Sequence, residues 1–190
     1  ERPPSSRIQG EPDDLKPGAV LGQYRLERVL GRGGMGTVFE ASHTGVIEKR
    51  FALKVLAHDL VALEDAERRF LAEAAVASRL DHAHIVNVHD FGSEHGISYL
   101  VMEYLRGESL ATRINRKELS IARIADIMIA VASGVTAAHE KGICHRDLKP
   151  ENIFLATVGN RDTVPKVLDF GIARVLESDG EGTLRGTLIG

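Results

Sequence analysis

Residues 145–152 combine an acid, several cations and an amide within eight positions, in the order His-Arg-Asp-Leu-Lys-Pro-Glu-Asn. Asp147 can orient a hydroxyl group and take its proton, and Lys149 can balance the charge of a phosphoryl group in transfer. Asn152 can offer its amide oxygen to Mg²⁺. A charged octet that ends in Pro-Glu-Asn is also typical of a solvated turn after a helix, so the residue types alone leave two interpretations open.

The same order of residues resembles the catalytic loop of protein kinases, and Lys149 stands two positions after Asp147, as in the serine/threonine branch of that family. The resemblance implies that Asp147, Lys149 and Asn152 are catalytic residues. Asp-Phe-Gly at residues 169–171 is a weak signal alone, but it follows a short predicted strand just after the octet. There it resembles the kinase element whose aspartate, here Asp169, holds Mg²⁺ together with Asn152.

A glycine-rich stretch follows residues 23–30, whose alternating polar and apolar side chains predict a half-buried strand. Gly31, Gly33 and Gly36 form the pattern G-x-G-x-x-G, which fits a dinucleotide-binding turn as well as a kinase glycine-rich loop. A dinucleotide turn must open a helix, whereas residues 37–41 predict a strand. A Walker loop is excluded because the final Gly-Lys-Ser/Thr is missing. We therefore expect a hairpin whose backbone amides close over nucleotide phosphates.

Residues 51–56 predict an apolar strand with Lys54 in its middle, where an ammonium group needs a partner unless it faces water at a sheet edge. The segment resembles the kinase Val-Ala-Ile-Lys strand, whose lysine contacts the phosphates and pairs with a helix glutamate. Residues 64–80 predict that helix. Its apolar stripe consists of Phe70, Ala74, Ala77 and Leu80. The resemblance favours Glu73 over Glu67 as the partner of Lys54, and a solvated glutamate is the alternative.

Residues 102–105, Met-Glu-Tyr-Leu, resemble the hinge between the two lobes of a kinase. By that resemblance, backbone groups of Glu103 and Leu105 hydrogen-bond to adenine, and apolar side chains enclose its ring. The residues that the resemblance assigns to nucleotide binding are Leu30, Gly31, Gly33, Gly36, Val38, Ala52, Lys54, Met102, Glu103, Leu105, Phe154 and Asp169.

Residues 120–140 predict a long core helix, because apolar side chains recur every three or four positions and Gly142 follows as a stop. We interpret it as a buried helix rather than a membrane span, since Arg123 and Asp126 interrupt it. The positions expected to face the core are Ile121, Ile124, Met128, Val131, Val135 and Ala138.

The composition is that of an ordinary globular protein: the 190 residues are 43% hydrophobic and 27% charged, with a net charge of −3. Because there is no basic footprint, no DNA or RNA partner is expected. Cys144 is the one cysteine, which excludes an internal disulfide and fits a reducing compartment. We expect a cytoplasmic location and no membrane segment in this chain. His82, His84 and His89 lack the spacing of a structural zinc site.

Residues 1–22 hold four of the six prolines and predict a flexible leader. Residues 23–104 resemble a kinase small lobe with its hinge, and residues 105–190 resemble the first part of the large lobe. The stretch from 172 to 190 predicts an activation loop, in which a phosphate on Thr183 or Thr187 would pair with Arg146. We expect the chain to be an excerpt that ends within this loop.

The expected fold is therefore α+β: a two-lobed, protein-kinase-like fold with a complete small β-rich lobe and the N-terminal part of the helical large lobe. The resemblance implies a serine/threonine protein kinase that uses ATP and Mg²⁺ to phosphorylate protein Ser/Thr hydroxyls in signalling, and a dimer for autophosphorylation is compatible with it. Three alternatives stay open. They are a nucleotide-binding pseudokinase, a small-molecule phosphotransferase, against which Lys149 argues, and an inactive, incomplete fragment.

Overall fold

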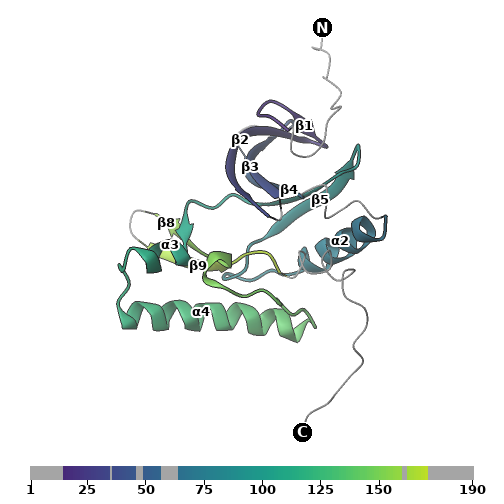
Figure 1. Ribbon diagram of the computed structural model, residues 1–190. Coiled ribbons are helices and arrows are strands. Elements are labelled where there is room, and N and C mark those ends of the chain that lie inside the picture. Colours follow the sequence, from purple (N-terminus) through teal and green to yellow (C-terminus); the bar gives the residue numbers. More distant parts are fainter. Residues whose placement is uncertain (1–14, 35, 46–48, 57–63, 160–161, 171–190) are drawn as a thin grey trace.

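A computed structural model of the chain describes residues 15–34, 36–45, 49–56, 64–159 and 162–170. Within them lie a six-stranded sheet and a three-stranded sheet, both antiparallel, with helices beside and below (Figure 1). The larger sheet has the strand order β1-β2-β3-β4-β6-β5. Its strands are β1 (Val20–Leu21), β2 (Tyr24–Gly33), β3 (Gly36–His43), β4 (Arg50–Leu56), β5 (Val88–Glu94) and β6 (Ile97–Glu103).

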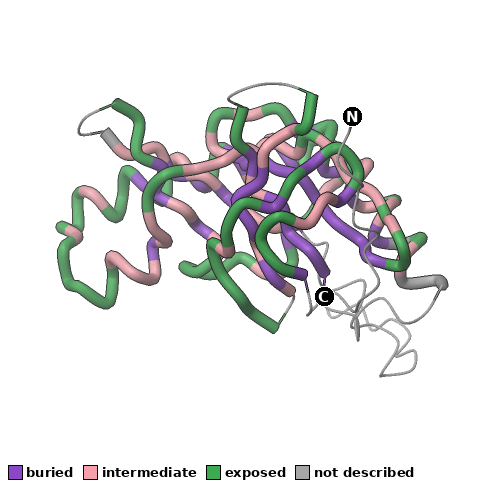
Figure 2. The backbone as a smooth tube through the Cα atoms, turned by 90° about the horizontal axis from the view of Figure 1, so that it is seen from above, coloured by how far each residue is buried: buried purple, intermediate pink, exposed green. Residues whose placement is uncertain are grey.

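The smaller sheet, in the order β7-β8-β9, joins the segment after β6 to a hairpin that follows the catalytic octet. Its strands are β7 (Gly107–Ser109), β8 (Ile153–Val158) and β9 (Asp162–Val167). The helices are α2 (Glu64–Ala77), α3 (Leu110–Asn115), α4 (Ile121–Glu140) and the 3₁₀ turn η2 (Pro150–Asn152). Figure 2 shows buried segments inside the molecule, enclosed by exposed loops.

The glycine-rich stretch is the turn of a hairpin, because β2 and β3 pair antiparallel up to Gly33 opposite Gly36. A strand rather than a helix follows the glycines, as predicted, so the dinucleotide-turn alternative is excluded. Gly36 has a φ of 126°, a value that residues with a side chain rarely adopt. The turn therefore depends on glycine at this position.

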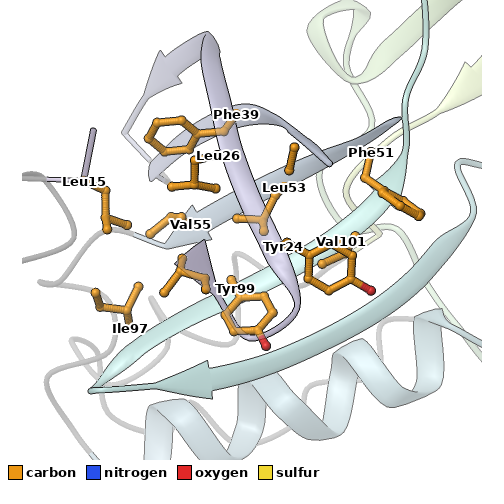
Figure 3. Packing of buried hydrophobic residues seen from close by; sticks show 12 residues of the cluster. Leu15, Tyr24, Leu26, Phe39, Phe51, Leu53, Val55, Ile97, Tyr99 and Val101 are labelled. Atoms are coloured by element: carbon orange, nitrogen blue, oxygen red, sulfur yellow. The ribbon is translucent and has the colours of Figure 1, made fainter. Parts of the chain in front are cut away.

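Strand β4 separates two environments because successive side chains of a strand point to opposite faces. Leu53 and Val55 are buried in the core enclosed by the larger sheet, which Figure 3 shows together with Tyr24. Ala52 and Lys54 lie on the other face, where they line a cleft. Lys54 is only 7% exposed, so the alternative of an edge-strand lysine facing water is wrong.

Helix α2 packs one apolar stripe against β5 and β6. The predicted stripe is confirmed, since all four of its residues are buried: Phe70, Ala74, Ala77 and Leu80. The helix itself ends at Ala77, three residues before the predicted end. Leu80 reaches the core from the turn that follows rather than from the helix.

The predicted leader is too long at its C-terminal end. Residues 1–14 lie outside the described part of the chain, but β1 pairs with β2, Leu15 is 5% exposed and Leu21 is fully buried. Both leucines belong to the core of the larger sheet. Two apolar residues spaced among prolines and glycines carry no period, so the sequence pattern missed them.

Helix α4 forms where it was expected, and Ser120 caps it by accepting a hydrogen bond from the amide of Arg123 at 3.2 Å. The predicted buried stripe is only half correct. Val131 and Ala138 are buried, but Ile121 is 87% exposed, and Ile124 and Met128 are exposed as well. The residues of α4 that are buried are Ile127, Val131, Gly134 and Ala138.

Which face of α4 is buried depends on the backbone that packs against the helix. A Cβ at Gly134 would stand 3.0 Å from the carbonyl oxygen of His84, so the missing side chain lets the two backbones approach. At the other end, Arg123 donates a hydrogen bond to the carbonyl of Thr163 in β9 at 3.0 Å. By length and composition alone, α4 is also long and apolar enough to cross a membrane, and 22% of its most apolar 18-residue window is buried.

Candidate active site

A cleft of about 540 Å³ lies between the two sheets. Its walls come from β2, β3 and β4, from the end of β6 and the segment after it, and from β8. All of the predicted nucleotide-binding residues except Gly33 and Gly36 line it. They are Leu30, Gly31, Val38, Ala52, Lys54, Met102, Glu103, Leu105, Phe154 and Asp169.

The predicted hinge, residues 102–105, offers a backbone donor beside the cleft. The Glu103 amide already donates to the carbonyl of Asn87 at 2.9 Å, so this amide is not available to a ligand. Within the described residues, the amide of Leu105 donates to no backbone carbonyl. Leu105 therefore has an unused donor beside the cleft that its side chain helps to line.

The Glu103 side chain fixes the hinge to the smaller sheet. Its Oε1 lies 2.6 Å from Nζ of Lys166 in β9 and also accepts a hydrogen bond from the Asn87 amide at 2.8 Å. Lys166 also donates to the carbonyl of Ile85 at 3.3 Å. Sequence analysis missed this ion pair, because no local pattern relates two residues that are 63 positions apart.

At the inner end of the cleft, Lys54 donates a hydrogen bond to Oδ2 of Asp169 at 2.8 Å. The two side chains are 9% and 22% exposed, so the ion pair is largely removed from water. Asp169 has a φ of 50°, in the left-handed region that a non-glycine residue rarely enters. Such backbone strain is concentrated at functional sites.

The predicted ion pair between Lys54 and Glu73 is absent from the described residues, because Asp169 takes the ammonium group instead. Glu73 faces a different cavity of about 180 Å³, lined also by Cys144, Arg146 and Phe170. Burial raises the pKa of the Glu73 carboxyl, and the charge of Arg146 opposes that rise. Glu73 is thus a half-buried carboxylate without an ion-pair partner among these residues.

The catalytic octet forms a compact hydrogen-bonded loop around Asp147. Lys149 Nζ lies 2.8 Å from Oδ2 of Asp147, and Asn152 Nδ2 donates to the same oxygen at 3.1 Å and to the Asp147 carbonyl at 2.9 Å. The bond from Lys149 is the main cause that lowers the pKa of Asp147 below its usual value, and it raises the pKa of Lys149. Asp147 is therefore ionised at neutral pH.

His145 anchors this loop to the strand that leads to Asp169. The imidazole is 3% exposed, donates through Nε2 to the carbonyl of Leu168 at 2.7 Å, and contacts the ring of Phe170 at 4.8 Å between centroids. The Leu168 amide donates to the carbonyl of Asn152 at 2.8 Å. These bonds hold Asn152 next to the segment that carries Asp169, although sequence analysis assigned no role to His145.

The donors that could hold Mg²⁺ are the Asp169 carboxylate and the Oδ1 of Asn152, which accepts no hydrogen bond from the described residues. Oxygen donors of this kind suit Mg²⁺, which keeps several waters and substrate oxygens in its shell. No group of three or more His, Cys, Asp or Glu side chains in the described residues could hold a metal. The predicted absence of a site at His82, His84 and His89 stays a prediction.

Sequence analysis missed several residues of the cleft wall. They are Arg28, Val86, Tyr104, Arg106, Gly107 and Leu168. Arg28 lies between two register shifts of β2, so strand alternation does not predict which face its side chain takes. Thr183 and Thr187, the predicted phosphorylation sites, lie outside the described residues.

Comparison with known proteins agrees with this geometry. A model of the protein kinase domain matches residues 24–188. The serine/threonine-protein kinase pkn3 of Myxococcus xanthus is 42% identical over 162 residues, which are 84% of this chain and 29% of that protein. PknJ of Mycobacterium tuberculosis, also a serine/threonine-protein kinase, is 38% identical over 88% of this chain and 28% of its own length.

Among solved structures, the Mycobacterium tuberculosis PknI kinase domain superposes with a TM-score of 0.75 and 34% identity, covering 84% of this chain and 62% of that domain. The two-lobed kinase-like fold, with a partial large lobe, is thereby confirmed. The chain spans less than a third of the curated relatives it matches. The family model covers most of its length, and this chain belongs to the protein kinase domain family.

Proposed function

We propose that this chain carries the nucleotide cleft and catalytic loop of a serine/threonine protein kinase, which transfers the γ-phosphoryl group of ATP to Ser or Thr hydroxyls of proteins. The observation that carries the proposal is the pairing of Lys54 with Asp169 at the inner end of the cleft, at 2.8 Å. The Leu168 amide donates a hydrogen bond to the carbonyl of Asn152, which holds the loop of Asp147 next to the segment that carries Asp169.

ATP fits the cleft in size and in chemistry. Apolar side chains of Leu30, Val38 and Ala52 lie on the larger-sheet side, and Phe154 lies on the smaller-sheet side. A flat aromatic base gains from such apolar enclosure, and the unused amide of Leu105 supplies a directional contact. The phosphates would extend towards Lys54, whose ammonium group balances their charge.

Each polar residue has a distinct task in the proposed transfer. Asp147, kept ionised by Lys149, orients the attacking hydroxyl and accepts its proton. Lys149 balances charge on the transferred group. Bound Mg²⁺, held by Asp169 and Asn152, would neutralise charge on the phosphates. Lys149 also favours a protein hydroxyl as acceptor over the small-molecule alternative.

The described conformation resembles a resting state of this machinery. Oδ2 of Asp169 is occupied by Lys54, so Lys54 must be released before that oxygen can bind a metal. Glu73 is the carboxylate that would receive Lys54, and it is unpaired within the described residues. We therefore propose that activation brings α2 and Glu73 towards Lys54.

The catalytic assignment is tested by Lys54→Met and Asp147→Asn in the full-length protein, with transfer of radiolabelled phosphate to protein as the measurement. Each variant should lose at least about 100-fold in activity, because each removes charge that acts in the transition state. Lys16→Met and Asp81→Asn make the same changes at exposed positions away from the cleft and should leave activity intact. Activity of either cleft variant within about tenfold of wild type would remove the assignment.

The proposal has three further parts. The protein acts in the cytoplasm, it dimerises for autophosphorylation, and phosphorylation of Thr183 or Thr187 controls its activity. The phosphate on either threonine would pair with Arg146, which is exposed next to Asp147. Mass spectrometry of active protein with neither threonine modified, together with full activity after Thr→Ala at both, would exclude that control.

A further inference from the structure

A buried carboxylate stands next to the cleft without lining it. Glu40 in β3 is 7% exposed, so its charge must be balanced. Oε2 lies 2.7 Å from Nη2 of Arg28 in β2, and Oε1 lies 3.3 Å from Nη1 of Arg50 in β4. Arg28 is directly opposite Glu40 in the strand register, whereas Arg50 is diagonal to it.

Two irregularities in β2 enclose the position of Arg28. The register with β3 shifts between Leu26 and Arg28 and again between Val29 and Gly31, so β2 carries an extra residue at each place. Such bulges bend a strand and redirect its side chains. The redirected Arg28 forms part of the cleft wall, just before the glycine-rich turn.

The same nitrogen of Arg28 also reaches the hinge. Nη2 donates to the hydroxyl of Tyr104 at 3.1 Å, across 76 positions of sequence. Tyr104 lines the cleft as well. One guanidinium group thus joins the carboxylate of Glu40, under the β2–β3 hairpin, to the phenol of Tyr104 in the hinge.

We propose that Arg28 is a positioning residue for the nucleotide: fixed by Glu40 and bonded to Tyr104, it sets the spacing between the β2–β3 hairpin and the hinge at the mouth of the cleft. The inference rests on the proposed ATP-binding function. Arg28 acts through the walls of the cleft, and Asp147 and Lys149 are not among the residues that line it. Its loss should therefore weaken nucleotide binding while leaving the chemical step unchanged.

The test is a double-mutant cycle in the full-length protein. Calorimetry measures the Kd of the protein for the Mg²⁺ complex of adenylyl imidodiphosphate, a non-hydrolysable analogue of ATP. The wild type is compared with Arg28→Met, Tyr104→Phe and the double variant. Each single change should raise the Kd about three- to tenfold, and the double variant should be no worse than Arg28→Met alone. The KM for ATP should rise in parallel, with kcat within about twofold of wild type.

Glu40→Gln should reproduce the effect of Arg28→Met, because it releases the guanidinium group. Arg50→Met is the matched control: it also removes a cation from Glu40, but Arg50 does not line the cleft, so the Kd should stay within about twofold of wild type. Strictly additive single effects, or a fall in kcat without a change in Kd, would overturn the inference. If wild-type protein fails to bind the analogue, the proposed function itself fails; if it binds and the variants bind equally well, only the role of Arg28 fails.

Discussion

The conformation of the site depends on which carboxylate pairs with the ammonium group of Lys54, that of Asp169 or that of Glu73. Lys54 pairs with Asp169, which leaves Glu73 half-buried and without an ion-pair partner among the described residues. Burial penalises the charged form of Glu73 and raises its pKa, against the opposing effect of Arg146. The unfolded chain therefore loses this proton at a lower pH than the folded chain. Above the ordinary value of 4.5, the ionised Glu73 makes the folded state less stable as pH rises.

Glu73→Gln in the full-length protein should raise Tm at pH 8 by on the order of 2 °C relative to wild type, because the variant has no charge to desolvate. The gain should shrink as the pH falls and the folded protein takes up the Glu73 proton, because the raised pKa of Glu73 favours its neutral form. Kinase activity should drop in the same variant if Glu73 pairs with Lys54 in the active state as proposed, since glutamine carries no charge for that ion pair.

Melting curves between pH 5 and 8 and a phosphate-transfer assay measure the two effects. Glu140→Gln, at an exposed position near the end of α4, should change neither Tm nor activity. A lower Tm for Glu73→Gln at pH 8 would mean that a cation pairs with Glu73 in the resting protein.

The pairing of β7 with β8 depends on one glycine. Gly107 opens β7 with a φ of 142°, and a Cβ there would stand 2.1 Å from the carbonyl oxygen of Leu155 in β8. Both residues belong to the pairing of β7 with β8, so a side chain at position 107 would push the two strands apart. Gly107 also lines the cleft, so the same backbone shapes the nucleotide site.

Gly107→Ala should cost about 1–3 kcal/mol from the strained φ alone, with a further cost from the clash. Gly96→Ala separates the two terms, because Gly96 has a φ of 77° but open space around its Cβ position. Chemical denaturation of the full-length protein should show a larger loss of stability for Gly107→Ala. Equal losses for the two variants would mean that β8 moves aside freely.

At the scale of the whole molecule, α4 is apolar on two faces and only one of them is covered in the described part of the chain. The buried face packs against β9 and the backbone of His84. The other face exposes Ile121 and Ile129, at 87% and 70%, with Met128 also exposed. In Figure 1, α4 forms the lower edge of the described structure.

The 190-residue chain expressed alone should therefore self-associate and show no turnover. Each aliphatic side chain left in water forfeits roughly 1.5–3 kcal/mol of burial, against a total stability of about 5–15 kcal/mol. Ile121→Lys with Ile129→Glu should raise the monomer fraction severalfold in size-exclusion chromatography. Ile127→Glu should instead unfold the protein, because Ile127 is fully buried. A monomeric wild-type chain whose melting Mg-ATP delays, and which phosphorylates protein, would contradict this expectation.

Local patterns were enough to predict most of the longer elements, and the resemblance to kinase motifs supplied most of the cleft. Alternation predicted β2, an apolar run predicted β4 and a helical period predicted α2 and α4. Gly31, Gly33 and Gly36 predicted the turn between β2 and β3. The short elements β7 and α3 carry too few residues for a period, so they were missed. The cleft residues came from the resemblance of these segments to kinase motifs, each of which lies within one element or loop.

Only the tertiary structure decided which of these residues meet. Lys54 pairs with Asp169 rather than Glu73, and Ile127 rather than Ile124 faces the core, because those choices depend on how separate elements pack. The link from Glu40 through Arg28 to Tyr104 crosses three segments in the same way. Periodicity describes one element at a time. An ion pair between residues 115 positions apart depends on the distance between elements, which only packing sets.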